Sequence, residues 1–445
     1  MASNSSQNVT GYVVFISLLF DLLAFTMILP LFPSLLDYYK QNDSDGLYQW
    51  LEKHISVFQK IIGVPDRFNG VLFGGILGSL FSFLQFASSP ILGGISDVYG
   101  RKPVMIICLI GILSSYIIWS KATTFSLFVW SRIIGGLSKG NVSLSMAIVT
   151  DVYVPEKRGR GMAMIGIAFS VGFVFGPMIG AAYAKWSHSQ EGDWFVQPAL
   201  LAVILTIINI IFVFFAFNES LPKRNRALSV VGKLSEAFTY INIIDLFKFK
   251  LLIGIVPSED VKKLRSLGSI YFMYLFLYSG LEFTLTFLTH NKFGYTSMQQ
   301  GWMFFGIGVT MALLQGGWVR KIPPSRTAKT ATLGLLLISP SFICIGMAES
   351  PPLLILGLFL YAVSTSIVVP CMTTLASHYG SDAHKGKAMG TFRSLGALAR
   401  AIGPVFASIL YWSVGPKITY FIGGTLLLLP WFLLKKTLKD TKEKK

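Results

Sequence analysis

Six charged side chains lie deep within long apolar stretches of the sequence, where a charge needs a partner. They are Asp21, Arg132, Lys139, Glu282, Arg393 and Arg400. A cation at the centre of a membrane span costs roughly 2.5–3.5 kcal/mol, so such residues normally face a bundle interior or water and pair with other groups. Four cations against two carboxylates leave a surplus of positive charge. The six residues therefore predict a substrate and coupling site for an organic anion.

The four cations occur in two pairs with the same spacing. Arg132 and Lys139 are seven residues apart, as are Arg393 and Arg400. Seven residues is nearly two helical turns, so each pair is expected on one face of a helix. The guanidinium groups of Arg132 and Arg400 can each offer two parallel hydrogen bonds to a carboxylate or sulfonate. Arg393 lies nearer the expected cytosolic end and could equally belong to an inner gate.

The two carboxylates suggest how transport could be linked to protons. A carboxylate beside a lysine in a cavity of low dielectric constant is a reasonable proton carrier, because protonation would free the cation for substrate. This leads to the hypothesis that Asp21 or Glu282 couples transport to protons. The sequence leaves an alternative open, in which the charges form structural ion pairs, such as Asp21 with Lys139 or Arg132, and the carboxylates only orient the cations.

The elements that must position these residues are membrane-spanning helices. The chain of 445 residues is 53% hydrophobic and 13% charged, with a mean hydropathy of +0.61, whereas a soluble domain is nearer 25% charged. Its apolar runs are about as long as a helix needs to cross a bilayer. We count twelve runs, at approximately 11–33, 69–92, 103–120, 125–149, 162–184, 195–217, 266–289, 298–319, 327–347, 352–375, 387–412 and 417–434. The prediction is an all-α polytopic membrane protein.

The distribution of charge predicts the orientation of the chain. The net charge is +17, but the basic residues lie in short loops and in the tail, which argues against a nucleic-acid partner. Loops after even-numbered runs are basic and loops after odd-numbered runs are mixed or acidic, so both termini are expected in the cytosol. The first run is expected to stay as an uncleaved anchor. Plasma membrane and endomembrane remain open.

Two longer connections and one repeat divide the chain. The outward connection 34–68 contains an amphipathic helical pattern and the sequon Asn42-Asp43-Ser44, so Asn42 is a candidate glycosylation site. Residues 158–177 align without gaps on 385–404, as expected of duplicated transporter folds. We therefore predict two pseudo-symmetric six-helix bundles, residues 1–217 and 266–445. The intervening cytosolic linker, 218–265, could be an interfacial helix or a solvated connection.

Two motifs concern how the helices connect and pack. In "GGISDVYGRKP" (93–103), Gly93 and Gly100 permit a tight turn and close packing. Asp97 can interact with a helix N-terminus or with Arg101, and Arg101 with Asp151 at the end of the fourth run. In "GFVFGPMIG" (172–180), small residues let helices approach and the proline can bend the span. The residues of this second motif are Gly172, Gly176, Pro177 and Gly180.

These motifs resemble those of the major facilitator superfamily. The first resembles its G-x-x-x-D-x-x-G-R-[RK] signature, with Val98 where a basic residue is usual, and the second resembles its antiporter element, although packing alone also explains the glycines. "DLLAFTMILPLFP" (21–33) matches the first span of tetracycline and multidrug proton antiporters, with Ala24 and Thr26 in place of two glycines. The chain is most similar to the vertebrate tetracycline-transporter-like branch, through "SRIIGGLSKGNVSLS", "FLYSGLEFTLTFLTH" and "GTFRSLGALARAIGP".

The resemblance implies a function and a mechanism. It implies secondary active transport of organic anions or amphipathic drug-like molecules by alternating access, with proton-coupled exchange and a cytosolic latch around Arg101. We expect a monomer in the lipid bilayer, with a small organic anion and protons as partners. A facilitative carrier and a transport-inactive sensor or scaffold remain as alternatives.

The sequence offers no sign of an enzyme or of a cofactor. Its three cysteines lie in apolar stretches without metal-ligand spacing, and its five histidines form no recognisable motif. No nucleophile–base pair and no P-loop is apparent. We therefore expect no metal, no cofactor and no ATP-driven pump.

Overall fold

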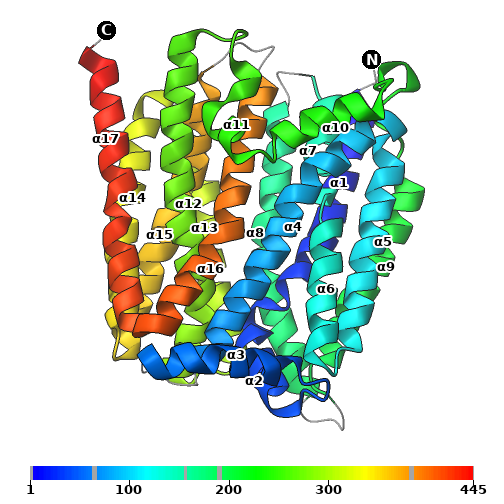
Figure 1. Cartoon of the computed structure of the whole chain (residues 1–445). Coiled ribbons are helices and arrows are strands. Elements are labelled where there is room, and N and C mark those ends of the chain that lie inside the picture. The colour runs from blue at the N-terminus through cyan, green and yellow to red at the C-terminus, as the bar shows by residue number, and fades with distance from the viewer. Residues whose placement is uncertain (1–3, 63–67, 155–157, 188–192, 380–384, 444–445) are drawn as a thin grey trace. The chain divides into compact units, whose positions relative to one another are not determined.

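The computed structural model describes residues 4–62, 68–154, 158–187, 193–379 and 385–443, and within these ranges every regular element is a helix. The helices of the first half are α1 (Asn4–Thr26), α2 (Phe32–Asn42), α3 (Leu47–Ile62), α4 (Asn69–Tyr99), α5 (Arg101–Ser120), α6 (Phe125–Ser138), α7 (Asn141–Val152), α8 (Arg158–Ser187) and α9 (Val196–Ala216). Those that follow are α10 (Val230–Thr239), α11 (Ile243–Lys248), α12 (Ser258–Phe293), α13 (Ser297–Gly317), α14 (Pro324–Met347), α15 (Pro351–Ser377), α16 (Lys385–Leu426) and α17 (Leu428–Glu443). Short 3₁₀ turns lie at Leu29–Leu31, Lys223–Asn225, Lys250–Leu252 and Val319–Lys321. The all-α fold class is confirmed (Figure 1).

Among the described residues, ten helical stretches are long and apolar enough to cross a bilayer, against the twelve apolar runs of the sequence. The run 125–149 is not among the ten stretches, because it is divided into α6 and α7, each too short to count alone. The last two runs are counted as one, because they lie in a single stretch of 54 residues, Gly386–Lys439. At 1.5 Å per residue that stretch would be about 80 Å long, far more than one crossing needs. Gly415, with φ +81°, interrupts it inside α16.

The surface of the helices fits a lipid environment. On α9, which carries no charged residue, Ile204, Ile211 and Phe215 are 53%, 53% and 78% exposed. These positions recur at helical spacing, so they form an apolar stripe along one face. An apolar face of this kind is stable in a bilayer and not in water.

The chain forms two compact units. Unit 1 comprises residues 1–58, 83–238 and 289–305, and unit 2 comprises 59–82, 239–288 and 306–445. Helices α3, α4, α12 and α13 each contribute residues to both units, and the last residue of α10, Thr239, belongs to unit 2. The predicted division at 1–217, 218–265 and 266–445 stays a prediction about domains.

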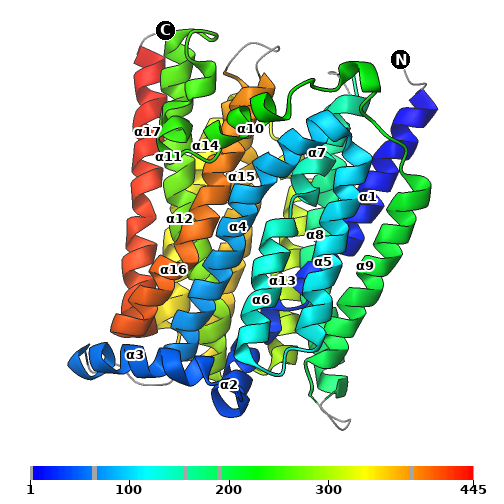
Figure 2. The ribbon, with the colours of Figure 1, turned by 45° about the vertical axis from the view of Figure 1, so that its right-hand side comes forward.

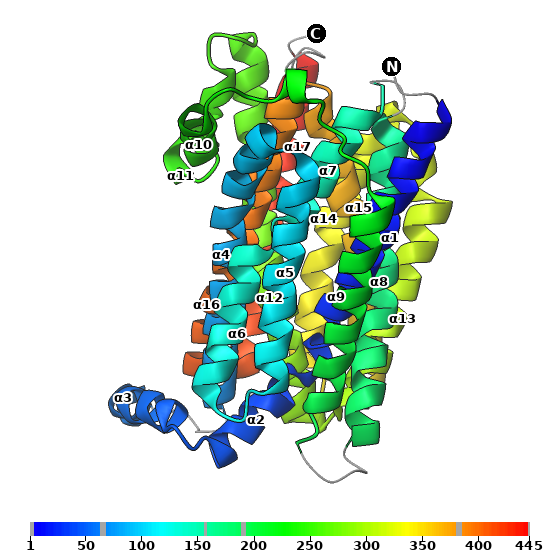
Figure 3. The ribbon, with the colours of Figure 1, turned by 90° about the vertical axis from the view of Figure 1, so that its right-hand side faces the viewer.

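Within unit 1, the long helices run side by side around α1 and α5 (Figures 2 and 3). Helix α1 contacts α7, α8 and α9, and α5 contacts α6, α7 and α9. Helix α1, which carries Asp21, is therefore packed against the helix that follows the break between α6 and α7, and against α8 and α9.

Within unit 2, α14 contacts α15, α16 and α17. Small residues allow these close approaches. A side chain at Gly357 would meet the backbone of α14 at Ile345 and Ser341, and the Ser341 hydroxyl donates a hydrogen bond to the Gly357 carbonyl oxygen at 3.0 Å. Backbone contacts through glycine and serine are typical of helix pairs in membranes, where packing and hydrogen bonds replace the hydrophobic effect.

The predicted repeat corresponds to equivalent helix pairs. Its two copies begin α8 at Arg158 and α16 at Lys385. Gly176 and Gly403 occupy the same repeat position. A side chain at Gly176 would meet α1 at Thr26 and Leu23, and one at Gly403 would meet α12 at the carbonyl oxygen of Phe276. Each copy therefore packs through the same glycine onto another long helix of its own unit.

The connection 34–68 contains α3, which the helical pattern predicted, and most of α2, which it did not. Asp43 stabilises the turn between them, because its carboxylate accepts the N–H groups of Tyr48 at 2.8 Å and of Phe125, the first residue of α6, at 2.9 Å. Asn42 is exposed at the end of α2, and its side-chain amide donates to the Tyr38 carbonyl oxygen at 3.0 Å. Glycosylation of Asn42 stays a prediction.

The linker between the halves contains α10 and α11, so it is not an unstructured connection. The helix expected from residue 266 begins earlier, at Ser258. Glu259 and Asp260 lie in its first turn, where negative charge favours the exposed N–H groups of a helix. The polar start of α12 was therefore missed by a search for apolar residues.

Candidate substrate and coupling site

The centre of unit 1 holds a buried ion pair between Asp21 of α1 and Lys139. The Lys139 ammonium group lies 2.7 Å and 2.8 Å from the two carboxylate oxygens of Asp21 and donates hydrogen bonds to both. The two residues are 2% and 3% exposed. The Lys139 ammonium group also lies over the Phe25 ring, 4.6 Å from its centroid. The ion pair that the sequence suggested is therefore present, and two contacts from α1 hold the lysine.

A break in the chain positions Lys139. Helix α6 ends at Ser138, and Lys139 follows with φ −79° and ψ +42°, before Gly140 leads into α7. The Ser89 hydroxyl of α4 donates to the Lys139 carbonyl oxygen at 3.5 Å, which satisfies a backbone group that the break exposes. Arg132 lies inside α6 and Lys139 is the first residue after it, so the predicted shared face of the two cations reaches the end of the helix and stays a prediction.

Arg132 lies in an aromatic environment on α6. Its guanidinium carbon is 5.6 Å from the centre of the Phe128 ring and 6.0 Å from that of the Trp119 ring. Both distances are within reach of a cation–π interaction, and Arg132 is only 4% exposed. Two aromatic neighbours thus lower the cost of a guanidinium at this depth.

The glycines of the 172–180 motif pack α8 against α1. Added side chains at Gly172 and Gly180 would meet Leu22 of α1 and Met27, the residue that follows α1. Thr26, which stands where the related antiporters have glycine, shares its hydroxyl proton between the carbonyl oxygens of Leu22 and Gly172, both at 2.8 Å. Helix α8 continues through Pro177. The motif fixes the helix that carries Asp21, and this threonine is compatible with close packing.

Alanine at Gly180 is expected to lower the free energy of unfolding by about 1–3 kcal/mol, because an added methyl group would overlap the backbone of Met27. The measurement is the melting temperature of the purified protein in detergent. Gly166 is the matched control on the same helix, since nothing lies within 4 Å of its side-chain position. Alanine there should be neutral or stabilising. Equal destabilisation by both substitutions would contradict this account.

In unit 2, Glu282 of α12 is held by two tyrosines. The hydroxyl groups of Tyr278 and Tyr361 donate to the same carboxylate oxygen at 2.8 Å and 2.6 Å. Their oxygens are 2.6 Å apart, and the rings stack with centroids 5.6 Å apart at 5°. Tyr361 of α15 was missed by the sequence analysis, because nothing in the local pattern connects it to α12.

Arg393 and Arg400 lie on α16 in the uninterrupted segment before Gly415, so here the expected shared face holds. Both side chains are exposed. The electrostatic neighbours of Arg400 include Glu282 and the hydroxyl groups of Tyr271 and Tyr278. No salt bridge to Arg400 is present within the described part of the chain. Arg400 is therefore an accessible cation in the electrostatic field of a carboxylate and of tyrosines of its own unit.

The motif at residues 93–103 forms a cluster around Arg101, called here the Arg101 cluster. The guanidinium group lies 2.7 Å from Asp97 and 2.8 Å from Asp151. It also donates to the Ser96 hydroxyl at 2.5 Å. Both ion pairs expected from the sequence are present, and Ser96 is an additional acceptor that it did not indicate.

The two glycines of that motif have different positions. Gly100 precedes α5 with φ +106°, a conformation that disfavours other residues. Gly93 lies inside α4 with open space at its side-chain position, so no turn or close contact requires it. The residue that packs closely is its neighbour Gly94, where an added side-chain carbon would lie 3.2 Å from the carbonyl oxygen of Lys233. The structural role expected of Gly93 is therefore wrong, because the helix extends past it to Tyr99.

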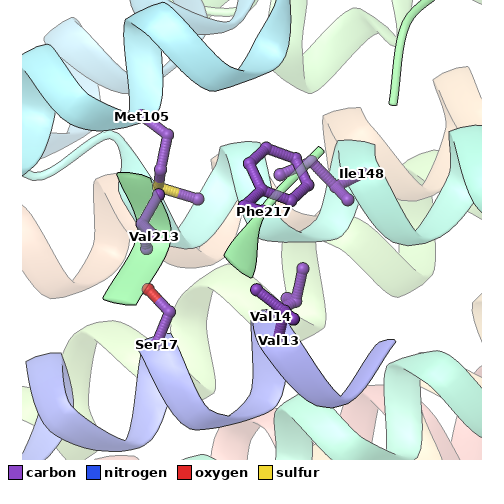
Figure 4. A pocket seen from close by; sticks show the side chains of 7 residues that line it. All are labelled: Val13, Val14, Ser17, Met105, Ile148, Val213 and Phe217. Carbon is purple, nitrogen blue, oxygen red and sulfur yellow. The ribbon is translucent and has the colours of Figure 1, made fainter. Parts of the chain in front are cut away.

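A small cavity in unit 1 lies among α1, α5, α7 and α9 (Figure 4). It is lined by Val13, Val14, Ser17, Met105, Ile148, Val213 and Phe217. Its volume of about 10 Å³ is at the lower limit for one water molecule. Ligand pockets are typically about 300–1,000 Å³, so this cavity is not a substrate site.

Among the described residues, no three His, Cys, Asp or Glu side chains come together as a metal site. The cysteines Cys108, Cys344 and Cys371 are free thiols, two of them buried. The charged groups of the two units are therefore the candidates for recognition of a ligand.

The chain as a whole is similar to known membrane transporters. The chain matches the family model of the Major Facilitator Superfamily over residues 14–404, which include the part of α1 that carries Asp21, the Arg101 cluster and the first part of α16. The chain belongs to the major facilitator superfamily. It is accordingly a multi-pass membrane transporter of small organic substrates and not an enzyme.

Individual relatives agree with this assignment. The chain is 45% identical to human Major facilitator superfamily domain-containing protein 10, over 95% of this chain and 92% of that protein. It is 24% identical to the class B tetracycline resistance protein of Escherichia coli, over 76% and 78%. The crystal structure of the human organic anion transporter MFSD10 (TETRAN) superimposes with a TM-score of 0.80 and 44% identity, over 96% of this chain and 99% of that one.

Proposed function

We propose that the chain is a secondary active transporter of organic anions that works by alternating access and proton-linked exchange. The observation that carries the proposal is Arg400, an exposed cation on a membrane helix without a salt bridge in the described ranges. A permanently charged guanidinium in such a place is costly unless a ligand binds it. The name of the human relative as an organic anion transporter supports the same class of substrate.

The surroundings of Arg400 suit an amphipathic anion. Tyr271, Tyr274 and Tyr278 follow one face of α12, and all three rings are buried or nearly so. Tyr274 and Tyr278 stack with ring centroids 5.4 Å apart. A carboxylate or sulfonate would bind the guanidinium, and an apolar group would lie against aromatic side chains. Arg132, between Phe128 and Trp119, has the same combination of chemical groups in unit 1.

Glu282 supplies a mechanism for proton coupling. Its negative charge and that of a substrate compete for Arg400, so the affinity for the anion depends on whether Glu282 carries a proton. The dependence is reciprocal, because an anion bound to Arg400 must then change the proton affinity of Glu282. Asp21 is the second candidate, but its carboxylate is completely buried against Lys139. Glu282 is only half-buried and is the more accessible of the two.

The test is uptake of a labelled amphipathic carboxylate into liposomes that contain the purified protein, with a pH gradient imposed in either direction. Accumulation against the substrate gradient is expected. Glu282→Gln should abolish accumulation while exchange at equal pH continues, because the amide cannot take up the proton. Asp21→Asn tests the second carboxylate in the same way.

Glu349→Gln is the matched control, since Glu349 is exposed and its nearest partner, Lys417, is 3.9 Å away. It should leave accumulation unchanged. If Glu282→Gln and Asp21→Asn both transported like the parent protein, the coupling mechanism would be wrong. Equilibration without accumulation in the parent protein would instead indicate a facilitative carrier.

The orientation of the chain is also a proposal. The positive-inside rule places both termini and the Arg101 cluster in the cytosol, and the sequon at Asn42 on the opposite side. In this orientation Asp97, Arg101 and Asp151 would act as a latch at the cytosolic face. Their short ion pairs support a latch that is stable in the state observed.

A further inference from the structure

The segment after α9 crosses the Arg101 cluster and contacts it at several points. The strap, defined here as residues 219–233, begins with Glu219, whose carboxylate accepts the backbone N–H groups of Arg101 at 2.9 Å and Lys102 at 3.2 Å. These two donors start α5, which has no side-chain cap of its own. Arg226 lies 3.5 Å from the same carboxylate. The strap therefore caps a helix that contains Arg101.

The far end of the strap contacts the partner of Arg101. The Ala227 N–H donates to the Asp97 carbonyl oxygen at 2.9 Å. The Lys233 ammonium group lies 3.3 Å from the Asp97 carboxylate and 3.1 Å from Glu236 on α10. Despite the cost of partial burial, its hydrogen bond to Glu236 and the charge of Asp97 keep the pKa of Lys233 above its ordinary value. Lys233 thus adds a cation to a motif that has Val98 in place of the usual basic residue.

Between these contacts, Ser229 is exposed and has two arginines before it. The sequence Arg224-Asn225-Arg226-Ala227-Leu228-Ser229 places guanidinium groups five and three residues before the hydroxyl. Residues 226–229 have no helix or strand, and Leu228 is fully exposed. A protein kinase binds its substrate segment in an extended form, and a kinase with acidic subsites selects arginine at these two positions through charge-assisted hydrogen bonds.

We propose that Ser229 is a phosphorylation site for a protein kinase that selects arginine at these two positions, and that the phosphate releases the strap from Asp97. In the modification, the serine hydroxyl oxygen attacks the γ-phosphorus of a nucleoside triphosphate. The new O–P bond forms, the bond to the β-phosphate oxygen breaks, the nucleoside diphosphate leaves, and the hydroxyl proton passes to the base of the kinase. No oxidation or reduction is involved.

The effect on the strap follows from distance and charge. Ser229 and Lys233 are one helical turn apart, as shown by the hydrogen bond from the Lys233 N–H to the Ser229 carbonyl oxygen at 3.3 Å. A phosphate carries about −1.5 to −2 charges at neutral pH, more than the Asp97 carboxylate, which already pairs with Arg101. The Lys233 ammonium group therefore moves from Asp97 to the phosphate, and α4 loses its ionic contact with α10.

The first test is incubation of the purified full-length protein with ATP and such a kinase, followed by mass spectrometry to locate and count phosphates. We expect one phosphate at Ser229, and none at this position in Ser229→Ala or in the double variant Arg224→Ala/Arg226→Ala. Ser235→Ala is the matched control, because Ser235 is exposed on α10 but has Gly232 and Val230 at the corresponding positions. Absence of phosphate at Ser229, or incorporation unaffected by the arginine variant, would overturn the assignment.

The second test measures hydrogen–deuterium exchange of residues 94–102 and 219–233 in the phosphorylated and unmodified protein. Exchange in both segments should rise about two- to fivefold, the effect of losing one partly exposed ion pair. Lys233→Gln should produce the same increase without phosphorylation, whereas Lys223→Gln, at the exposed start of the strap, should not. Unchanged exchange after full modification would refute the release of the strap. Neither test measures transport, so each can fail independently of the proposed function.

Discussion

Replacement of Lys139 by methionine is expected to lower the free energy of unfolding by about 3–5 kcal/mol, because it leaves a buried carboxylate without its partner. Asp21 has no exposed side-chain surface, and both of its oxygens accept hydrogen bonds from Lys139. Methionine preserves the length and apolar part of the lysine side chain, so little packing is lost. The melting temperature in detergent is the measurement, and it should fall by several degrees.

A second substitution separates loss of charge balance from loss of packing. Asp21→Asn in the Lys139→Met background removes the unpaired charge, so most of the stability should return. Lys121→Met is the control, since Lys121 is exposed at the end of α5. If the double variant were as unstable as Lys139→Met alone, the ion pair would not explain the destabilisation.

Replacement of Arg400 by glutamine is expected to reduce anion uptake at low substrate concentration by about 10- to 100-fold. The estimate follows from a loss of about 1.5–3 kcal/mol for hydrogen bonds to a charged group, with a factor of ten for each 1.4 kcal/mol. The effect should appear mainly in KM, because glutamine removes a binding charge. Uptake of the labelled carboxylate into liposomes, measured over a range of substrate concentrations, gives both constants.

Two further variants make the result specific to an anion site. Arg400→Lys retains the charge but not the planar guanidinium group, so it should lose less affinity than glutamine. Arg393→Gln tests the neighbouring arginine on the same face, which in the role of an inner gate would alter the rate of transport more than KM. An unchanged KM in Arg400→Gln would exclude Arg400 from the anion site.

Neutralising the ion pair and neutralising Arg400 thus test different properties. The ion pair of Asp21 and Lys139 is buried and saturated with hydrogen bonds, so its first effect is on stability. Arg400 is exposed and makes no salt bridge with the residues that the structure describes, so its effect is on binding. Both charges occur in apolar stretches of the sequence. The difference between them is therefore due to their surroundings in the structure.

Much of the fold and part of the site could be predicted from the sequence. Apolar runs of membrane length identify the helices, because a bilayer requires each crossing to satisfy its own backbone hydrogen bonds. The motif around Arg101 indicated both of its acidic partners, and the deep charges suggested a pair between Asp21 and either Lys139 or Arg132, of which the structure contains the first. In each case the residue type demands a partner, and few oppositely charged residues are available.

The tertiary structure alone decided which groups complete these pairs. Tyr361 joins Glu282, and Glu219 and Lys233 join the Arg101 cluster, from helices or loops distant in the sequence. Helical periodicity predicts the face on which a residue lies, but it does not say which other helix covers that face. The break at Lys139 was also hidden, because an apolar run reads the same whether its helix is continuous or divided. The sequence by itself determined the membrane helices, the family and the charges that need partners, and the packing of those helices determined the partners.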